Sequence, residues 1–415
     1  MTVTKTTPYR STFLAEEAAD AWKYFQETGY PDSKNESWRF SNPTKWLNLD
    51  GERISSNNDF KVEFSNYIIP NSIPIIIINE KLVVPQPLPD GIQAIDIRAE
   101  STSNIANDSF GEVTDYHYSS FVAENIALFQ NYISLHIAEN TRLDHPIHFI
   151  HLVKAKSSCR LFPRIHVNVG SGAEVEVWKT ESGIDNNSYF INSVTEVIVH
   201  ENASLKWTNS QELNPQTGHI SSFNISLKKD ASAKYNSFDF GGGFVRNEIH
   251  THFEAPNGDC EINNLFIPNG KQHIDISTMM HHKNPLCSSR QLVKGILSGN
   301  STAVFRGLAN VYKEAGKTNA QQNNKNLILS SSARVHSIPQ LEIYEDDVKC
   351  SHGSTTGQID EGALFYLQSR GINRTDAMEL MVRGFANEVV DKVENQDVKE
   401  YIQNSLIQKM EGMIQ

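Results

Sequence analysis

The chain has 415 residues, of which 39% are apolar and 21% charged, proportions typical of a globular protein with a sizeable core. Its net charge of −12 argues against a nucleic-acid partner, because such partners are bound by clustered Lys and Arg. No apolar run approaches the ~20 residues of a membrane span, and residues 1–20 have no apolar signal core. We therefore expect a cytoplasmic protein that binds neither nucleic acid nor membrane.

Residues 1–115 are expected to form an N-terminal helical and mixed region. Apolar residues recur every three to four positions between Phe13 and Phe25, which predicts a helix. An aromatic and cationic segment follows at 38–47, and later residues mix short strands such as Ile75–Ile78 with Pro- and Asn-rich turns.

A strand, a polar turn with one small residue and a second strand recur along residues 116–350. Aligned segments place six small residues at gaps of 30, 28, 27, 43 and 32: Ala173, Ala203, Ala231, Gly258, Ser301 and Ala333. A repeat near 30 is typical of a solenoid, whose coils bury their inward residues against one another. A β-sandwich also has short strands and regular turns. The long stretch without helical periodicity nevertheless favours a mainly β chain, with a right-handed parallel β-helix core flanked by N-terminal and C-terminal helical regions.

Residues 351–415 are expected to form a C-terminal helical domain. Asp360 predicts the start of one helix, and Asn373 or Thr375 can cap a second. Apolar spacing predicts a third helix at about 397–412. These helices would cap the β-helix core and offer a surface for a partner protein.

Cys350 and His352 stand two residues apart, just ahead of the first of these helices. Thiolate and imidazole are suitable ligands for iron and zinc, and residues i and i+2 of an extended strand share a face. On spacing alone, a half-buried Cys beside a surface His is the simpler interpretation. Two ligands also fall short of the four that zinc or a cluster takes, so a site here must borrow ligands from elsewhere in the chain or from another subunit.

The remaining cysteines, Cys159, Cys260 and Cys287, lie dozens of residues apart without a CxxC pair. This spacing argues against a zinc ribbon, a self-contained Cys₄ cluster or a disulfide framework, so we expect three small buried hydrophobic residues.

Three groups of histidines occur on predicted strands. Solvent-facing ladder positions on a β-helix explain them without a metal: His145, His148 and His151; His250 and His252; His281 and His282.

Other motifs do not indicate an enzyme. A phosphate-binding loop at EAGKT would need Gly five positions before Gly316, where the chain has Val311. The run Gly241–Gly243 indicates a turn, and no Ser-His-Asp or paired-carboxylate motif stands out. We do not expect this chain to hydrolyse ATP.

The segment 347–372, DVKCSHGSTTGQIDEGALFYLQSRGI, resembles the signature of the SufD family, scaffold subunits of the SUF iron–sulfur cluster assembly system. Segments 288–312, 319–344 and 29–40 resemble this family too, so the similarity reaches both ends of the chain. The CSHG motif and the lack of clustered N-terminal cysteines resemble SufD rather than its paralogue SufB. Departures such as Ser354 for the commoner Ala remove no candidate ligand.

The resemblance implies a non-catalytic scaffold that pairs with a SufB-like paralogue and docks a SufC-like ABC ATPase on its C-terminal helices. By position, His352 and Cys350 match the family motif near the SufB interface, where a transient iron–sulfur cluster shared with SufB would form. His352 is the stronger candidate, and the sequence leaves open whether Cys350 binds iron or only packs. A homodimer of the chain alone and a flavin on the assembled complex are further possibilities that the resemblance raises.

Two alternatives stay open at the level of the residues. A carbohydrate-active β-helix enzyme, a lyase or hydrolase, would need a groove lined by carboxylates and Lys or Arg, usually in a secreted protein. A purely structural partner of SufB would differ from the scaffold only in that His352 binds no iron.

Overall fold

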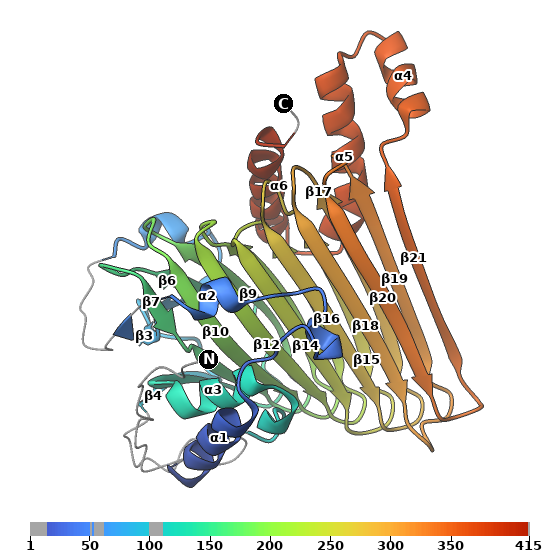
Figure 1. The fold of residues 1–415 in the computed structure, drawn as a ribbon. Helices are drawn as coiled ribbons and strands as arrows, with labels where there is room; N and C mark the ends of the chain where they lie inside the picture. Colours follow the sequence, from blue (N-terminus) through green and yellow to red (C-terminus); the bar gives the residue numbers. More distant parts are fainter. Residues whose placement is uncertain (1–14, 50–51, 54–61, 99–110, 414–415) are drawn as a thin grey trace.

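The computed structural model describes residues 15–49, 52–53, 62–98 and 111–413. Within them a solenoid of about eight turns carries helices toward both ends of the chain (Figure 1). The predicted parallel β-helix is thereby confirmed. Phe13, at the start of the first expected helix, lies outside the described residues. No helix in the described part of the chain is long and apolar enough to cross a membrane.

Two large sheets face each other across the core, and from β8 onward the chain alternates between them from strand to strand. Sheet A contains, in spatial order, β20 (Arg334–Ile343), β18 (Thr302–Val311), β16 (His273–His282), β14 (Phe244–Phe253), β12 (Thr217–Leu227), β10 (Tyr189–Val199), β8 (Arg164–Val169), β5 (Asn131–Ile137) and β4 (Ile92–Arg98). Strand β7 (Cys159–Leu161) also pairs with β10, and β1 (Glu52–Arg53) pairs with β7. Sheet B contains β21 (Lys349–Gln358), β19 (Asn319–Ile328), β17 (Ser288–Leu297), β15 (Asp259–Phe266), β13 (Ser232–Asp239), β11 (Ser204–Glu212), β9 (Glu174–Gly183), β6 (Ile147–Val153), β2 (Ile73–Ile78) and β3 (Lys81–Val83).

Strand pairing is parallel along each sheet until its N-terminal end. There β4 pairs antiparallel with β5, and β3 pairs antiparallel with β2. The strand predicted at Ile75–Ile78 is confirmed as part of β2. Both sheets therefore draw strands from residues before 116, and β21 continues past residue 350 to Gln358.

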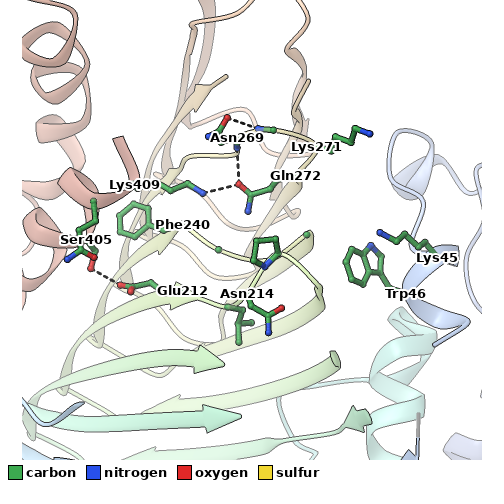
Figure 2. Close-up of a pocket in the computed structure, with 16 residues that line it drawn as sticks. Lys45, Trp46, Glu212, Asn214, Phe240, Asn269, Lys271, Gln272, Ser405 and Lys409 are labelled. Atoms are coloured by element: carbon green, nitrogen blue, oxygen red, sulfur yellow. Dashed lines mark hydrogen bonds between the residues drawn. The ribbon is translucent and has the colours of Figure 1, made fainter. Parts of the chain in front are cut away.

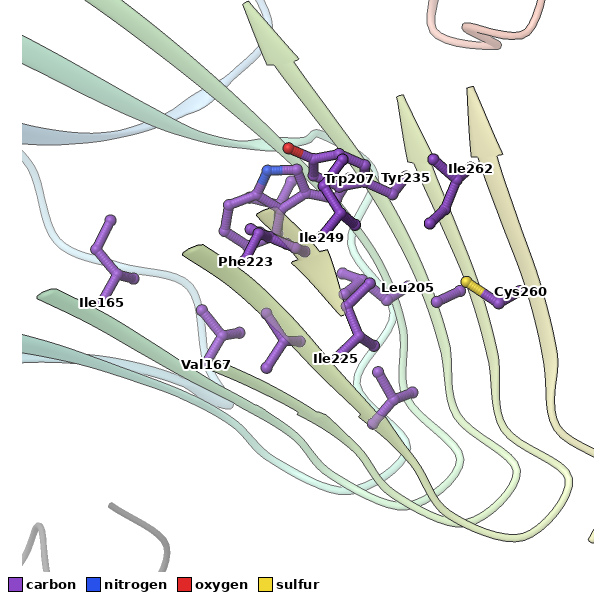
Figure 3. Packing of buried hydrophobic residues seen from close by; sticks show 14 of the residues in the cluster. Ile165, Val167, Leu205, Trp207, Phe223, Ile225, Tyr235, Ile249, Cys260 and Ile262 are labelled. Carbon is purple, nitrogen blue, oxygen red and sulfur yellow. The ribbon is translucent and has the colours of Figure 1, made fainter. Parts of the chain in front are cut away.

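The core lies between the sheets, because alternate residues of each strand point inward. Figure 3 shows Trp207, Phe223 and Tyr235 meeting in this interior, with ring centroids 5.0 Å apart for Trp207 and Phe223 and 4.4 Å apart for Phe223 and Tyr235. Cys260 joins the same apolar cluster. Cys159 and Cys287 are buried as well, so all three cysteines predicted to be buried are buried.

The structure corrects the register of the predicted repeat. The first four aligned small residues, up to Gly258, lie in turns that lead from sheet A to sheet B, whereas Ser301 and Ala333 lie in the opposite turns. The gap of 43 residues therefore arises because the sequence alignment shifts there by about half a coil, from one set of turns to the opposite set. Strand partners such as Ile225 and Thr251 show the true period, which is 26 residues at that step.

The N-terminal elements cover the outer face of sheet A. Helix α1 packs on α3, and their apolar residues form one cluster that includes Trp22, Phe25 and Tyr132. These elements are α1 (Ala15–Thr28), the 3₁₀ turn η1 (Glu36–Trp38), α2 (Thr44–Leu47), the turn η4 (Tyr116–Tyr118) and α3 (Ser120–Leu128). The turn η2 (Ser65–Tyr67) packs instead on sheet B, where Tyr67 joins a cluster with Ile76 and Ile150.

Three helices end the chain: α4 (Glu361–Ser369), α5 (Arg374–Val390) and α6 (Gln396–Glu411). Asp360 and Asn373 cap the first two with their side chains, as predicted, and Asn395 caps the third. Helices α5 and α6 share an apolar cluster with residues of sheet B, whereas α4 projects beyond the sheets (Figure 1).

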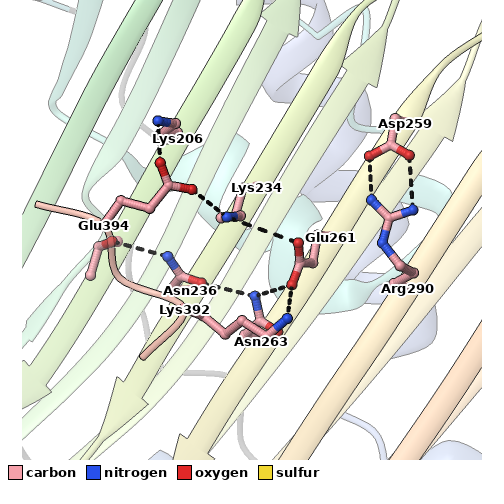
Figure 4. Close-up of polar contacts among 10 residues, drawn as sticks. Lys206, Lys234, Asn236, Asp259, Glu261, Asn263, Arg290, Lys392 and Glu394 are labelled. Atoms are coloured by element: carbon pink, nitrogen blue, oxygen red, sulfur yellow. Dashed lines mark hydrogen bonds and ion pairs between the residues drawn. The ribbon is translucent and has the colours of Figure 1, made fainter. Parts of the chain in front are cut away.

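The linker between α5 and α6 is fixed to the outer face of sheet B by ion pairs (Figure 4). Lys206 and Lys234 each place Nζ 2.6 Å from a carboxylate oxygen of Glu394, and Lys392 donates to Glu261 at 2.7 Å. The two lysines hold the pKa of Glu394 down at about 2. The C-terminal helices are thus held by charge at the linker and by apolar packing along the helices.

Candidate functional site

Cys350 and His352 lie on β21, the last strand of sheet B, which pairs with β19. The register places Cys350 beside Ala320 and His352 beside Gln322, both of which are buried. The two side chains therefore belong to rows that face the interior of the β-helix, on one side of the strand. The structure brings the predicted pair together at the open end of the solenoid.

The two candidate ligands differ in exposure. Cys350 is half-buried and packs against the apolar core, and this burial raises the pKa of its thiol. A thiol of raised pKa is mostly protonated near neutral pH, so it binds a metal only on losing its proton. His352 is exposed, because no further strand of the described chain stacks on β21.

The described residues do not complete this site. No third His, Cys, Asp or Glu of the described ranges groups with Cys350 and His352 at metal-binding distance. Cys260 occupies the same inward row three strands away, roughly 14 Å at the usual strand spacing of about 4.8 Å. The described residues thus offer only two soft side chains here, and the metal site at Cys350 and His352 stays a prediction.

The interior beside these residues is polar, a feature that the sequence interpretation missed. Ser337 of β20 donates to Asn324 of β19 at 2.7 Å, and its hydroxyl also lies 2.7 Å from that of Ser354. Gln322 is buried in the same end of the solenoid. The run QQNNKN at 321–326 was the available signal, because alternation places every second polar residue inside.

Strands β20 and β21 form the open edges of the two sheets. Each is ten residues long, and every residue in both is half-buried or exposed. Long unpaired edges offer a row of free backbone N–H and C=O groups to another chain. The candidate ligands therefore sit on a surface suited to strand pairing.

Helix α5 is fixed close to this end by a buried lysine. The ammonium of Lys294 on β17 donates to the Phe385 carbonyl at 2.7 Å and to Glu388 at 2.6 Å. It also lies 3.9 Å from the ring centroid of Phe385. Apolar residues of α4 and α5 nevertheless stay exposed: Phe365 at 72%, Tyr366 at 56% and Leu380 at 54%.

A cavity of about 670 Å³ lies away from β21, between α6, α2 and the turns that follow β11, β13 and β15 (Figure 2). Lys409 of α6 donates to Gln272 at 2.9 Å, and burial lowers the pKa of its amine to about 8. Ser405 donates to Glu212 at 2.7 Å. Trp46 lines the opposite side and packs against Gly243, where a Cβ would come within 2.6 Å of its ring. The predicted turn at Gly241–Gly243 is confirmed. The cavity thus lies where α2 and α6 meet the turns of the β-helix.

The prediction that the other histidines face solvent is wrong for most of them. His148 is fully buried against Trp178, with ring centroids 3.8 Å apart, and His151 faces the interior, where it contacts Glu181 at 3.1 Å. His282 is buried too, and His145 is exposed as expected. His250, His252 and His281 do lie at outer positions of sheet A, as predicted. N-terminal segments cover these positions, and strand spacing cannot predict such a long-range contact.

The described chain is a parallel β-helix with helices at both ends and two open edge strands, β20 and β21. The profile of the SUF system FeS cluster assembly SufBD core domain matches residues 151–385, so this chain belongs to the SufBD family. Within that family it is SufD-like, and its role is in iron–sulfur cluster assembly.

Relatives support this assignment over nearly the whole chain. The chain is 29% identical to the iron–sulfur cluster assembly protein SufD of Escherichia coli over 388 residues, which cover 93% of this chain and 90% of that protein. A SufBD family protein of Synechocystis is 29% identical over 381 residues, covering 88% and 84%. The chloroplastic protein ABCI7 of Arabidopsis thaliana is 27% identical over 400 residues, covering 91% and 82%.

Proposed function

We propose that this chain is a non-catalytic scaffold subunit that pairs through β20 and β21 with a SufB-like paralogue, so that His352 and Cys350 contribute to a shared site for the nascent cluster. The observation that carries the proposal is the coincidence of two soft ligands with the open edge of sheet B.

The edge strands support pairing with a related chain. A partner with the same fold would present edges of similar length and twist, and strand addition supplies main-chain hydrogen bonds along all ten residues. It would also cover the polar interior around Asn324, Ser337 and Ser354, whose side chains already bond to one another. Pairing would therefore bury an edge that is costly to leave exposed.

The ligand chemistry supports a transient cargo. A cluster takes about four ligands, and this chain contributes at most two, so release follows from separation of the two subunits. Neutral imidazole is a weaker donor to iron than thiolate, which favours transfer to a recipient. Cys350 gives up its proton only when a metal cation is close, because burial raises the pKa of the thiol.

The test is co-expression of the chain with SufB-like and SufC-like partners, followed by iron and acid-labile sulfide assays on the purified complex. H352A is expected to lower both contents by about tenfold or more, since a ligand is removed. C350S is expected to lower them less. H145A, which removes an exposed histidine elsewhere, is the matched control. An H352A complex with the wild-type iron content would contradict the proposal.

A SufC-like ATPase is proposed to dock on α4 and α5, where Phe365, Tyr366 and Leu380 are exposed. ATP hydrolysis then belongs to the partner. The double variant F365A/Y366A is expected to lose the ATPase from the co-purified complex while retaining the SufB-like subunit. L286A, which truncates an exposed apolar residue outside the helices, serves as its control. Retention of the ATPase by F365A/Y366A would place the docking surface elsewhere.

The carbohydrate-active alternative gains no support from the family match, which covers the β-helix itself. The homodimer, the flavin on the assembled complex and the cytoplasmic location stay predictions.

A further inference from the structure

Three histidines gather on the outer face of sheet A, away from the edge strands. His250 and His252 lie two residues apart on β14, and the register places His281 of β16 directly beside His252. The rings of His252 and His281 are nearly parallel, with centroids 4.7 Å apart and an interplanar angle of 6°. His250 lies against both, with centroid distances of 6.4 Å and 6.1 Å.

The nitrogens of this cluster converge. One ring nitrogen from each of the three histidines lies within 4.8 Å of the other two. A tetrahedral ion with bonds of about 2.0–2.1 Å holds its ligands roughly 3.3 Å apart. Ring rotation therefore has to close at most about 1.5 Å per pair, a change within reach of side-chain torsions.

N-terminal residues within 31–38 and 113–122 cover the cluster, and we call these residues the roof. His252 is 9% exposed and His281 8%. A cavity of about 130 Å³ adjoins His250 and His252 and is also lined by Trp38, Asp115 and Met279. Arg246 fixes part of this roof: its guanidinium donates to the Ser37 carbonyl at 3.0 Å and lies 4.0 Å from the Trp38 ring centroid.

Burial keeps these imidazoles neutral, the form that binds metals. Desolvation lowers the pKa of His250 to about 4, with a further contribution from the nearby Arg246 charge. Desolvation and then the neighbouring His281 lower the pKa of His252 to about 2. The pKa of His281 is lowered to about 4, by burial and then by His250.

The ring nitrogens of the three histidines make few hydrogen bonds to other residues. Among the described residues, neither His250 nor His252 has a side-chain hydrogen bond, and each stacks with the other two histidine rings. His281 Nδ1 lies 3.3 Å from the Tyr312 hydroxyl, an outer contact of the kind that orients ligating imidazoles. Met279, the strand partner of His250, adds a thioether at the edge of the same cavity.

We propose that His250, His252 and His281 bind one divalent first-row transition-metal ion, at a site separate from Cys350 and His352. Imidazole suits Zn²⁺, Fe²⁺, Ni²⁺ and Cu²⁺ rather than Mg²⁺ or Ca²⁺, which prefer oxygen ligands. Three protein nitrogens leave at least one coordination position open toward the cavity, where water or the Met279 thioether can bind. The bound ion would tie β14 to β16 and stabilise the roof.

The test is a titration of the EDTA-treated, full-length C350S/H352A protein with Co²⁺ at pH 7.5, followed by visible absorption. This background removes the edge-strand ligands. We expect one equivalent of Co²⁺ to bind, and H250Q, H252Q or H281Q to weaken binding at least tenfold. H145A is the matched control, because it removes an exposed histidine and leaves the cluster intact. Displacement of the Co²⁺ by Zn²⁺, or by Fe²⁺ under argon, identifies the preferred ion and supports the site in either case.

H250Q keeps the test decisive if the buried variants misfold, because His250 is only half-buried. A crystal of the wild-type chain grown with Zn²⁺ should also show an anomalous difference peak between the three rings. Failure of Co²⁺ to saturate, or binding that H250Q leaves unchanged, would overturn the proposal without affecting the cluster-scaffold assignment.

Discussion

The two ends of the β-helix are built differently. At the N-terminal end the sheets finish in the antiparallel strands β3 and β4, and an apolar cluster of α1 and α3 covers the neighbouring face of sheet A. At the C-terminal end the sheets finish in β20 and β21, which are parallel, ten residues long and half-buried or exposed throughout. Within the described residues, helices pack beside the first end, whereas the strands of the second end stay half-buried or exposed.

The side chains that point into the core also differ between the two ends. The first coils pack Ile, Val and Phe against one another, whereas the last coils place Gln322, Asn324 and Ser337 inside. At the open end, Cys350 and His352 share one face of β21. Polar side chains also lie inside earlier coils, where His151 contacts Glu181, so the open edge strands rather than polarity set the last coil apart.

The largest effect expected from this difference is on stability. Ile225 and Leu341 occupy the same inward row, joined through Thr251, Met280 and Ala309. Ile225 is fully buried and Leu341 half-buried. We expect I225A to lower the free energy of unfolding by about 2–5 kcal/mol and L341A by about 1 kcal/mol or less, measured by denaturant unfolding.

Binding of the SufB-like subunit should raise the cost of L341A, since the partner would complete burial of that side chain. The cost of I225A should stay the same. If I225A and L341A lowered the free energy of unfolding of the isolated chain equally, the proposed difference between the interior of the β-helix and its open end would be contradicted.

A smaller effect concerns the attachment of the C-terminal helices. The pKa of Glu394 is about 2 in the folded chain because Lys206 and Lys234 bond to it, against an ordinary value near 4.5. A depressed carboxyl pKa stabilises the fold above pH 4.5, and this stabilisation is lost as the pH falls toward 2. The Glu394 side chain is 51% exposed, so the contribution is below about 1 kcal/mol.

Limited proteolysis of the α5–α6 linker between pH 6 and 2, with an acid-stable protease, measures this effect. The wild-type linker should become more susceptible as the pH falls, and E394Q should already be susceptible at pH 6. Parallel pH profiles for the two proteins would show that these ion pairs do not hold the linker.

Local patterns predicted much of this fold. Asp360 and Asn373 cap helices because a short polar side chain satisfies free N–H groups next to it in sequence. The i,i+2 spacing correctly placed Cys350 and His352 on one face of a strand. The half-coil slip before Ser301 shows the limit: both kinds of turn use small residues, so sequence similarity alone does not separate the two ends of a coil.

Contacts between distant segments could not be predicted in this way. His252 and His281 are buried because residues near Trp38 and Asp115 fold over sheet A, and nothing in the strand pattern indicates that roof. The same applies to Lys294, whose partners Phe385 and Glu388 lie some ninety residues later. Such positions depend on tertiary packing rather than on spacing.

Hydrogen–deuterium exchange of the chain, alone and bound to the SufB-like subunit, tests the central claim most directly. The account predicts that backbone amides of β20 and β21 exchange much more slowly in the complex, while those of β3 and β4 exchange at unchanged rates. Unchanged exchange in β20 and β21, or slowing confined to β3 and β4, would contradict the assignment of the open end as the partner site.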